Sequence, residues 1–158
     1  MSKTVGNKLP ADLYQRLAGS DLHAHAEKAI VICTVDAGGW PHPAMLSYFE
    51  VIAKDDRNIR LAVYGNTTTT NNMRRNGKLS IVIVDERVAY YIKGTVEELA
   101  REMTCSPQNA KLNCRVEQVL ADEANEEHEP GSYIASAILY KRRADPMEQK
   151  KLLRELVE

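Results

Sequence analysis

The chain has 158 residues, which is the length of one domain with a substantial core, so we expect a single domain over residues 1–158. Its 21 basic and 22 acidic residues leave a net charge of −1, without the basic excess that nucleic-acid or anionic-membrane partners usually require. Its three cysteines show no CxxC spacing, no apolar run follows Met1, and no stretch approaches the roughly 18 apolar residues of a membrane span, which predicts a cytoplasmic protein.

The chain is predicted to begin with short helices. Leu13 and Leu17 have helical spacing and Gly19 follows them, so a helix is predicted over residues 10–18. A further helical turn is predicted over residues 20–28, before the pattern changes.

From residue 29 the pattern is typical of β-strands. The segments AIVICTVD and PHPAMLSYFEVIA are rich in branched and apolar residues, and the turn AGGW joins them as a hairpin. In IRLAVY the residues Ile59, Leu61 and Val63 alternate with a second face that includes Ala62, which predicts a half-buried strand. Gly94 is a predicted bulge in the last strand of this series. The five predicted strands are 29–36, 41–53, 59–64, 78–85 and 88–98.

The segment between residues 64 and 79, YGNTTTTNNMRRNGKL, separates two of these strands. Thr67 or Thr68 is a good helix N-cap and Gly77 stands where a helix commonly ends, so a two-turn helix is predicted. A helix N-terminus presents free backbone N–H groups and the positive end of the helix dipole, and nearby hydroxyls make it a candidate phosphate cradle. The alternative is a capped connector that binds nothing.

The last third of the chain mixes predicted strands and helices. Residues 97–106 carry a helical apolar stripe, which favours a short helix, although the alternative is that the preceding strand continues. Residues 112–117 alternate as a strand does, which makes Cys114 an inward hydrophobic residue and not a ligand. An acidic loop precedes YIASAILY, residues 133–140, which is the last predicted strand. Asp145 before a proline predicts a C-terminal helix.

Many short strands with few inserted helices favour a closed or partly closed β-barrel over a parallel sheet. The predicted fold is mainly β with peripheral helices: a split β-barrel of six to eight mostly antiparallel strands.

Histidines are the usual carriers of catalytic chemistry, yet none is assigned here. His23 and His25 lie two residues apart without a completing ligand, so no metal site is predicted. His42 stands at a strand entry, where it either faces a cleft or caps a turn. The sequence lacks the hydrolase, zinc-protease, P-loop and dinucleotide-binding motifs, and no residue is a convincing general base, so the catalytic residues are unknown.

The order of three segments is more informative than any single one. The pair TVDAGGWPHP, the hinge NNMRRNGKLS and the strand AYYIKG together resemble the pyridoxamine 5′-phosphate oxidase-like family of FMN-binding split β-barrels. The resemblance covers about residues 28–98 and implies a homodimer that binds two flavins at the subunit interface. The matching residues are Thr34, Val35, Asp36, Gly39, Pro41, His42, Asn72, Met73, Arg74, Arg75, Asn76, Leu79, Ser80, Tyr91 and Gly94.

The resemblance implies FMN as the cofactor and an FMN-dependent oxidoreductase of unknown substrate as the function. The flavin ring would lie along the backbone of the second strand, and its phosphate would lie at the hinge. The implied cofactor-binding residues are Met45, Leu46, Ser47, Thr67, Thr68, Thr69, Thr70, Asn72 and Arg74.

Three positions depart from the family pattern. Thr69 stands where flavin-binding members carry lysine, and Ala44 and Phe49 stand where many oxidases carry arginine and lysine. Charge-assisted hydrogen bonds contribute roughly 1.5–3 kcal/mol each, so these departures argue against true pyridoxamine phosphate oxidase activity. The alternative function is a flavin-free dimeric barrel that is structural or binds another ligand such as haem or a deazaflavin. The sequence leaves the substrate and the electron acceptor open.

Overall fold

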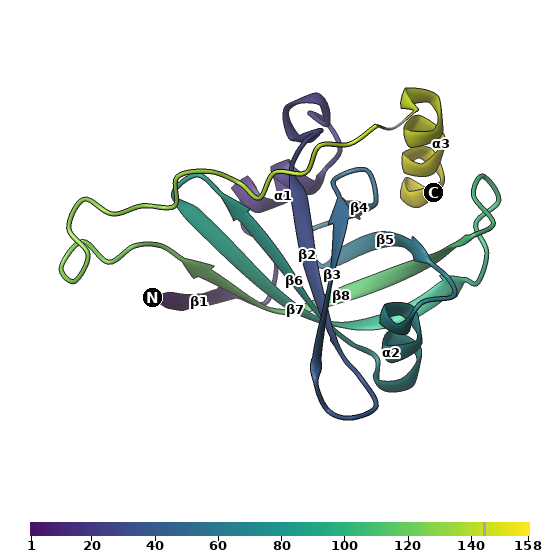
Figure 1. Ribbon diagram of the computed structural model, residues 1–158, viewed down its shortest axis with the longest axis horizontal. Coiled ribbons are helices and arrows are strands. Elements are labelled where there is room, and N and C mark those ends of the chain that lie inside the picture. The colour runs from purple at the N-terminus through teal and green to yellow at the C-terminus, as the bar shows by residue number, and fades with distance from the viewer. Residues whose placement is uncertain (144) are drawn as a thin grey trace.

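The computed structural model describes residues 1–143 and 145–158, and it is dominated by one curled antiparallel sheet (Figure 1). Eight strands form this sheet in the order β3-β2-β6-β7-β8-β5-β4, with β1 paired to β8 outside that path. The predicted split β-barrel with six to eight antiparallel strands is therefore confirmed. The strands are β1 (Ser2–Gly6), β2 (Ala29–Val35), β3 (Pro41–Ser47), β4 (Val51–Ala53), β5 (Asn58–Tyr64), β6 (Lys78–Asp85), β7 (Val88–Ala100) and β8 (Asn109–Asp122).

Three α-helices and one 3-10 turn lie around the sheet. Helix α1 (Ala11–Leu17) is followed by the 3-10 turn at His23–His25, and α2 (Thr68–Asn76) is inserted between β5 and β6. Helix α3 (Pro146–Val157) ends the chain, and its N-cap Asp145 accepts a hydrogen bond from the Met147 N–H, as the sequence predicts. Within the described residues, no helix has the length and apolar character needed to cross a lipid bilayer.

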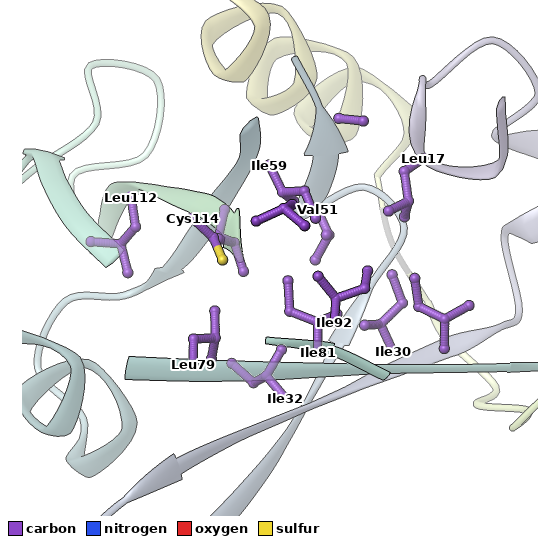
Figure 2. Packing of buried hydrophobic residues seen from close by; sticks show 14 of the residues in the cluster. Leu17, Ile30, Ile32, Val51, Ile59, Leu79, Ile81, Ile92, Leu112 and Cys114 are labelled. Atoms are coloured by element: carbon purple, nitrogen blue, oxygen red, sulfur yellow. The ribbon is translucent and has the colours of Figure 1, made fainter. Parts of the chain in front are cut away.

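The core is aliphatic and lies inside the curl of the sheet, where side chains from six strands and α1 meet (Figure 2). Alternate residues of β6 point into it, which is the pattern expected of a strand with one face on the core. A second, smaller cluster joins Ile52, Ala62 and Met103 to Leu156 of α3. Helix α3 therefore covers the outer face of β5 at Ala62, so this strand, predicted to be half-buried, is buried on both faces at that point.

The predicted bulge at Gly94 is confirmed. The register between β7 and β8 shifts between Lys93 and Gly94. A Cβ atom at Gly94 would lie 2.4 Å from Cys114 Sγ and 2.5 Å from the Arg115 carbonyl oxygen. Only glycine fits this position without a shift of the backbone.

Three predicted elements are wrong: the long strand over residues 41–53, the helix over residues 97–106 and the last strand over residues 133–140. The predicted strand over residues 41–53 is broken at Tyr48–Glu50, where a turn separates β3 from β4. The predicted helix over residues 97–106 is absent from the described chain, because β7 continues to Ala100 and pairs there with Lys111 of β8. The apolar residues of that stripe instead face different surroundings: Met103 is buried beneath α3, Val96 packs against the main core, and Leu99 is 42% exposed.

The segment predicted as the last strand, residues 133–140, is extended but forms a single bridge, between Lys28 and Leu139. Its main chain bonds to β2 only at the start of that strand, where the Ala29 N–H donates to Ile138 O at 2.8 Å. Further along, β2 is already paired with β6 on that side, so no ladder can form. Residues 133–143, named the C-terminal arm below, run across the barrel towards α3 (Figure 1). Strand β1 was not predicted, because its residues are mostly exposed and polar.

Candidate functional site

The threonine hinge forms a helix with the predicted cap. Thr67 has an extended backbone, and its Oγ1 accepts a hydrogen bond from the Thr70 N–H at 3.2 Å. At the other end Gly77 adopts a left-handed conformation with φ of 65°, and its N–H donates to Met73 O. The N-cap and the stop residue are both confirmed.

Two of the four threonine hydroxyls are engaged inside the hinge. The Thr70 hydroxyl donates to Tyr64 O at 2.7 Å, and the Thr67 hydroxyl lies 3.2 Å from the same carbonyl oxygen. Thr68 is exposed. Its hydroxyl and the backbone N–H groups of Thr68 and Thr69 have no hydrogen-bond partner within residues 1–143 and 145–158. These groups form the part of the hinge that is available to a phosphate.

Two other predicted hinge residues hold α2 against the sheet. Asn72 is buried, and its Nδ2 donates to Thr34 Oγ1 of β2 at 2.9 Å. Arg74 pairs with Glu98 of β7, with its Nε 2.7 Å from Oε2, and also donates to Gly65 O. Their side chains are occupied in this arrangement, and a role toward a ligand stays a prediction for both.

The predicted ring-binding residues lie in a different place, on a cavity of about 400 Å³. This volume falls within the roughly 300–1,000 Å³ that is typical of small-molecule and cofactor sites. The cavity lies between the end of β3 and the C-terminal arm, with Tyr64 at the end of β5 forming part of its wall. It is lined by Ala26, Lys28, Ala29, Met45, Leu46, Ser47, Glu50, Tyr64, Tyr140, Lys141, Arg142 and Arg143.

Tyr64 connects this cavity to the hinge. Its side chain is 63% exposed and lines the cavity, while its carbonyl oxygen is held by the hinge threonines. Met45 and Tyr140 are also more than half exposed. The cavity therefore combines a mostly polar lining with a few exposed apolar and aromatic side chains, against which a planar ring could pack.

One wall of the cavity is cationic. Lys28 pairs with Asp85 at 3.1 Å and Lys141 with Glu27 at 3.3 Å. Arg143 forms no ion pair with any part of the chain that the structure describes. This wall favours a ligand that carries negative charge.

Glu50 organises the junction between β3 and the arm. Its Oε2 accepts hydrogen bonds from the Ser47 N–H at 2.7 Å and from the Ser47 hydroxyl at 2.8 Å. The same oxygen lies 3.3 Å from Arg142 Nη1 of the arm. This carboxylate therefore causes the turn that breaks the predicted long strand, and it fixes the arm at the cavity edge.

A half-buried polar cluster lies behind the cavity. The His25 ring stacks on Tyr48 with centroids 4.6 Å apart. Burial and the neighbouring Lys28 charge lower the pKa of His25, so the imidazole is neutral at neutral pH. Burial alone would raise the pKa of Asp85, but the Glu86 N–H, Lys28 and Arg16 outweigh it, and the pKa lies below its ordinary value.

Tyr48 makes stability sensitive to alkaline pH. Burial, followed by the charge of Asp85, raises the pKa of Tyr48 to about 12. The neutral phenol is thus favoured in the folded state, and its contribution is complete below pH ~10 and lost as pH rises towards the folded pKa. Between these pH values we expect the free energy of unfolding of the wild-type protein to fall by roughly 1 kcal/mol per pH unit through this phenol. Tyr48→Phe should abolish this decrease, as measured by urea unfolding.

The matched control for this prediction is Tyr133→Phe, at a tyrosine that is 53% exposed. If the two variants have the same pH dependence above pH 10, the phenol of Tyr48 does not control alkaline unfolding.

Sequence reasoning missed the contribution of the arm. Residues 141–143, Lys-Arg-Arg, are three consecutive basic residues directly after a segment that resembles a strand, and this signal could have identified them. Phe49 lies on a neighbouring cavity of about 420 Å³ that shares Glu50, Tyr64, Arg142 and Arg143 with the first. His42 lies on β3 outside both linings. Over the described residues, no three His, Cys, Asp or Glu side chains converge as metal ligands would.

Comparisons with known proteins show which family the chain is similar to. The family model described as pyridoxamine 5′-phosphate oxidase matches residues 23–149. The Bacillus subtilis protein YclD is 35% identical over 112 residues, covering 71% of this chain and 73% of YclD.

Two solved structures share the fold at low identity. A Lactobacillus delbrueckii protein described as a candidate pyridoxamine 5′-phosphate oxidase has a TM-score of 0.57 and 19% identity, covering 74% of this chain and 98% of its own. HupZ of Group A Streptococcus has a TM-score of 0.53 and 23% identity, with coverage of 66% and 90%. With a family model that spans most of its length and a relative at 35% identity, the chain belongs to the pyridoxamine 5′-phosphate oxidase family.

Proposed function

We propose that this protein is an FMN-binding flavoprotein that acts as a flavin-dependent oxidoreductase. The observation that carries the proposal is the cavity beside Met45–Ser47, which is joined through Tyr64 to a helix N-terminus with free backbone N–H groups. This pairing offers exposed apolar and aromatic side chains for a ring and a polar cradle for a phosphate. The family resemblance implies the same two segments for these purposes.

The residues present fit FMN despite the missing family cations. Thr69 is only 7% exposed, so its position contributes a backbone N–H and not a side-chain charge. The arm supplies positive charge instead, because Arg143 has no acidic partner among the described residues and lines the cavity. A charged arginine can bind a phosphate or an anionic substrate group by charge-assisted hydrogen bonds. This compensation supports cofactor binding without supporting pyridoxamine phosphate oxidase activity.

Each part of the site has a separate role in the proposed function. When bound, FMN supplies the hydride or electron transfer. The backbone of Met45–Ser47 orients the ring, and Glu50 keeps this strand end and the arm in register. Thr68 and the N–H groups beside it hold the phosphate. The chain provides binding and orientation, and no side chain is assigned a proton-transfer role.

The proposal includes a homodimer. Strand β3 is at one end of the sheet order, paired only with β2. The β2–β3 hairpin carries apolar side chains in solvent, with Trp40 73% exposed and Met45 59% exposed. An unpaired edge with exposed apolar residues is a surface that a second copy would cover.

Titration of the purified protein with FMN, followed by flavin fluorescence and visible absorbance, tests the proposed function. We expect saturable quenching, and Arg143→Gln should weaken binding about tenfold, since one charge-assisted hydrogen bond is lost. The matched control is Arg115→Gln, at an exposed arginine of β8 outside the cavity lining.

Absence of FMN binding under these conditions would overturn the proposal and favour the flavin-free barrel. A haem Soret band or deazaflavin absorbance after addition of those ligands would then identify the alternative cofactor.

A further inference from the structure

A second hollow, of about 690 Å³, lies between α3 and the strands that it covers. It shares no lining residue with the cavity at Met45–Ser47. Four cationic side chains line it: Arg60 of β5, Lys111 of β8, and Lys151 and Arg154 of α3. Segments far apart in the sequence thus bring like charges to one concave surface.

The two acidic residues of this hollow offset only part of the charge of the four cations. Both carboxylate oxygens of Glu155 accept backbone hydrogen bonds, from the Thr104 N–H at 2.6 Å and from the Cys105 N–H at 2.8 Å. Glu158 lies 3.8 Å from Arg154, on the exposed side of the helix. Neither Arg60 nor Lys151 forms an ion pair within the described chain.

Arg60 is the least satisfied of the four. Its Nε is buried and has no hydrogen-bond partner among the described residues. Burial and the charge of Arg60 lower the pKa of Lys111, although Glu155 and Glu158 oppose this effect, as expected for two like charges on one hollow. A buried N–H without a partner and the repulsion between two cations both cost free energy. An anionic ligand would relieve both costs, by accepting the hydrogen bond and by neutralising charge.

Anchoring of α3 explains only part of this arrangement. Lys111 Nζ donates to Glu155 O at 2.5 Å, and Lys54 Nζ donates to Val157 O, so these two lysines satisfy carbonyl groups at the C-terminal end of the helix. Arg60 and Lys151 have no such role.

We propose that this hollow is a binding site for a small phosphate-bearing anion, separate from the proposed flavin site. The Arg60 side chain would turn so that its unpaired Nε–H reaches a phosphate oxygen, and Lys111 and Lys151 would supply the remaining charge. A diphosphate or a phosphate monoester with a second anionic group matches several cations around one hollow better than a monovalent anion does. Binding would join β5, β8 and α3 through one ligand and thereby stabilise the docked helix.

The test uses thermal unfolding and the Arg60 side-chain NMR signal, with pyrophosphate and inorganic phosphate as probes. We expect pyrophosphate to raise the Tm of the full chain saturably and to shift the Arg60 Nε–H resonance. Sodium chloride at the same ionic strength should do neither. Arg60→Gln should fold with an unchanged Tm in phosphate-free buffer and weaken pyrophosphate binding at least tenfold.

Lys151→Gln provides a second variant at an exposed position, and Lys93→Gln, on the exposed face of β7, is the matched charge control. The proposal is overturned if chloride or citrate reproduces the effect of pyrophosphate, or if Lys93→Gln weakens binding as much as Lys151→Gln. It is also overturned if Arg60→Gln lowers the Tm while pyrophosphate leaves the wild-type Tm unchanged, because Arg60 would then only support the helix.

Discussion

Gly94→Ala is expected to lower the free energy of unfolding by about 3 kcal/mol, at the upper end of the usual cost of overpacking. The added Cβ would lie 2.4 Å from Cys114 Sγ and 2.5 Å from the Arg115 carbonyl oxygen. The cysteine is fully buried and the carbonyl is backbone of β8, so neither can move without disturbing the longest strand pair of the sheet. Urea unfolding followed by circular dichroism measures the effect.

Gly65→Ala is the matched control. Its Cβ would have its nearest contact at 3.5 Å, an ordinary van der Waals distance, so we expect almost no loss of stability. Equal stabilities of the two variants would show that β7 and β8 can separate at Gly94, and that the close approach does not constrain the barrel.

Replacing Thr67 and Thr68 together by alanine is expected to weaken FMN binding roughly ten- to a hundredfold. The two single variants should have different effects, one on stability and one on FMN affinity, because the Thr67 and Thr68 hydroxyls differ in their hydrogen-bond partners. Thr67→Ala removes the cap of α2 and should cost about 1 kcal/mol of stability. Thr68→Ala removes an exposed hydroxyl and should weaken FMN binding at unchanged stability.

Fluorescence titration and thermal unfolding of the same three variants separate the two roles. Thr4→Ala, on β1, which pairs with β8 away from the hinge, serves as the control. If Thr68→Ala binds FMN as wild type does and Thr67→Ala loses only stability, the hinge is a capped connector and the phosphate binds elsewhere. This outcome would leave FMN binding by the cavity at Met45–Ser47 intact.

Local signals predicted the hinge correctly because every one of them acts within a few residues. A threonine that caps, a glycine that stops and the single apolar side chain of Met73 between them predict α2 from residues of the segment itself. The same holds for the cap at Asp145. These helix ends follow from local backbone hydrogen bonding.

The errors occur where a distant segment decides the local structure. Residues 97–100 remain a strand because β8 pairs with them, and Ala62 is buried because α3 covers β5. Residues 133–140 have strand composition but find no free edge, since β6 occupies the side of β2 on which they would pair. The composition of a segment indicates its propensity to form a strand, but it does not indicate whether a sheet edge is free to pair with that segment.

The candidate site was predicted in part for the same reason. The residues on β3 and in the hinge lie on segments that the family resemblance covers, and the structure places Met45, Leu46 and Ser47 on one cavity. The opposite wall comes from Tyr140–Arg143, beyond that resemblance. Its position depends on main-chain contacts with Glu27 and Ala29, more than a hundred residues earlier. Such a pairing cannot be read from a single sequence.

The position of the C-terminal arm also bears on how this family can diversify. The arm forms a cavity wall, yet its basic residues are exposed and lie outside the barrel core. Substitutions at such positions usually change stability by no more than about 0.5 kcal/mol. Under the proposed function, exchanging the charge of Lys141 or Arg143 is expected to alter ligand preference while the barrel stays folded. Arg142 is more constrained, because it lies 3.3 Å from Glu50, the residue that fixes the arm to the end of β3. Ligand choice and sheet stability would thus depend on largely different residues.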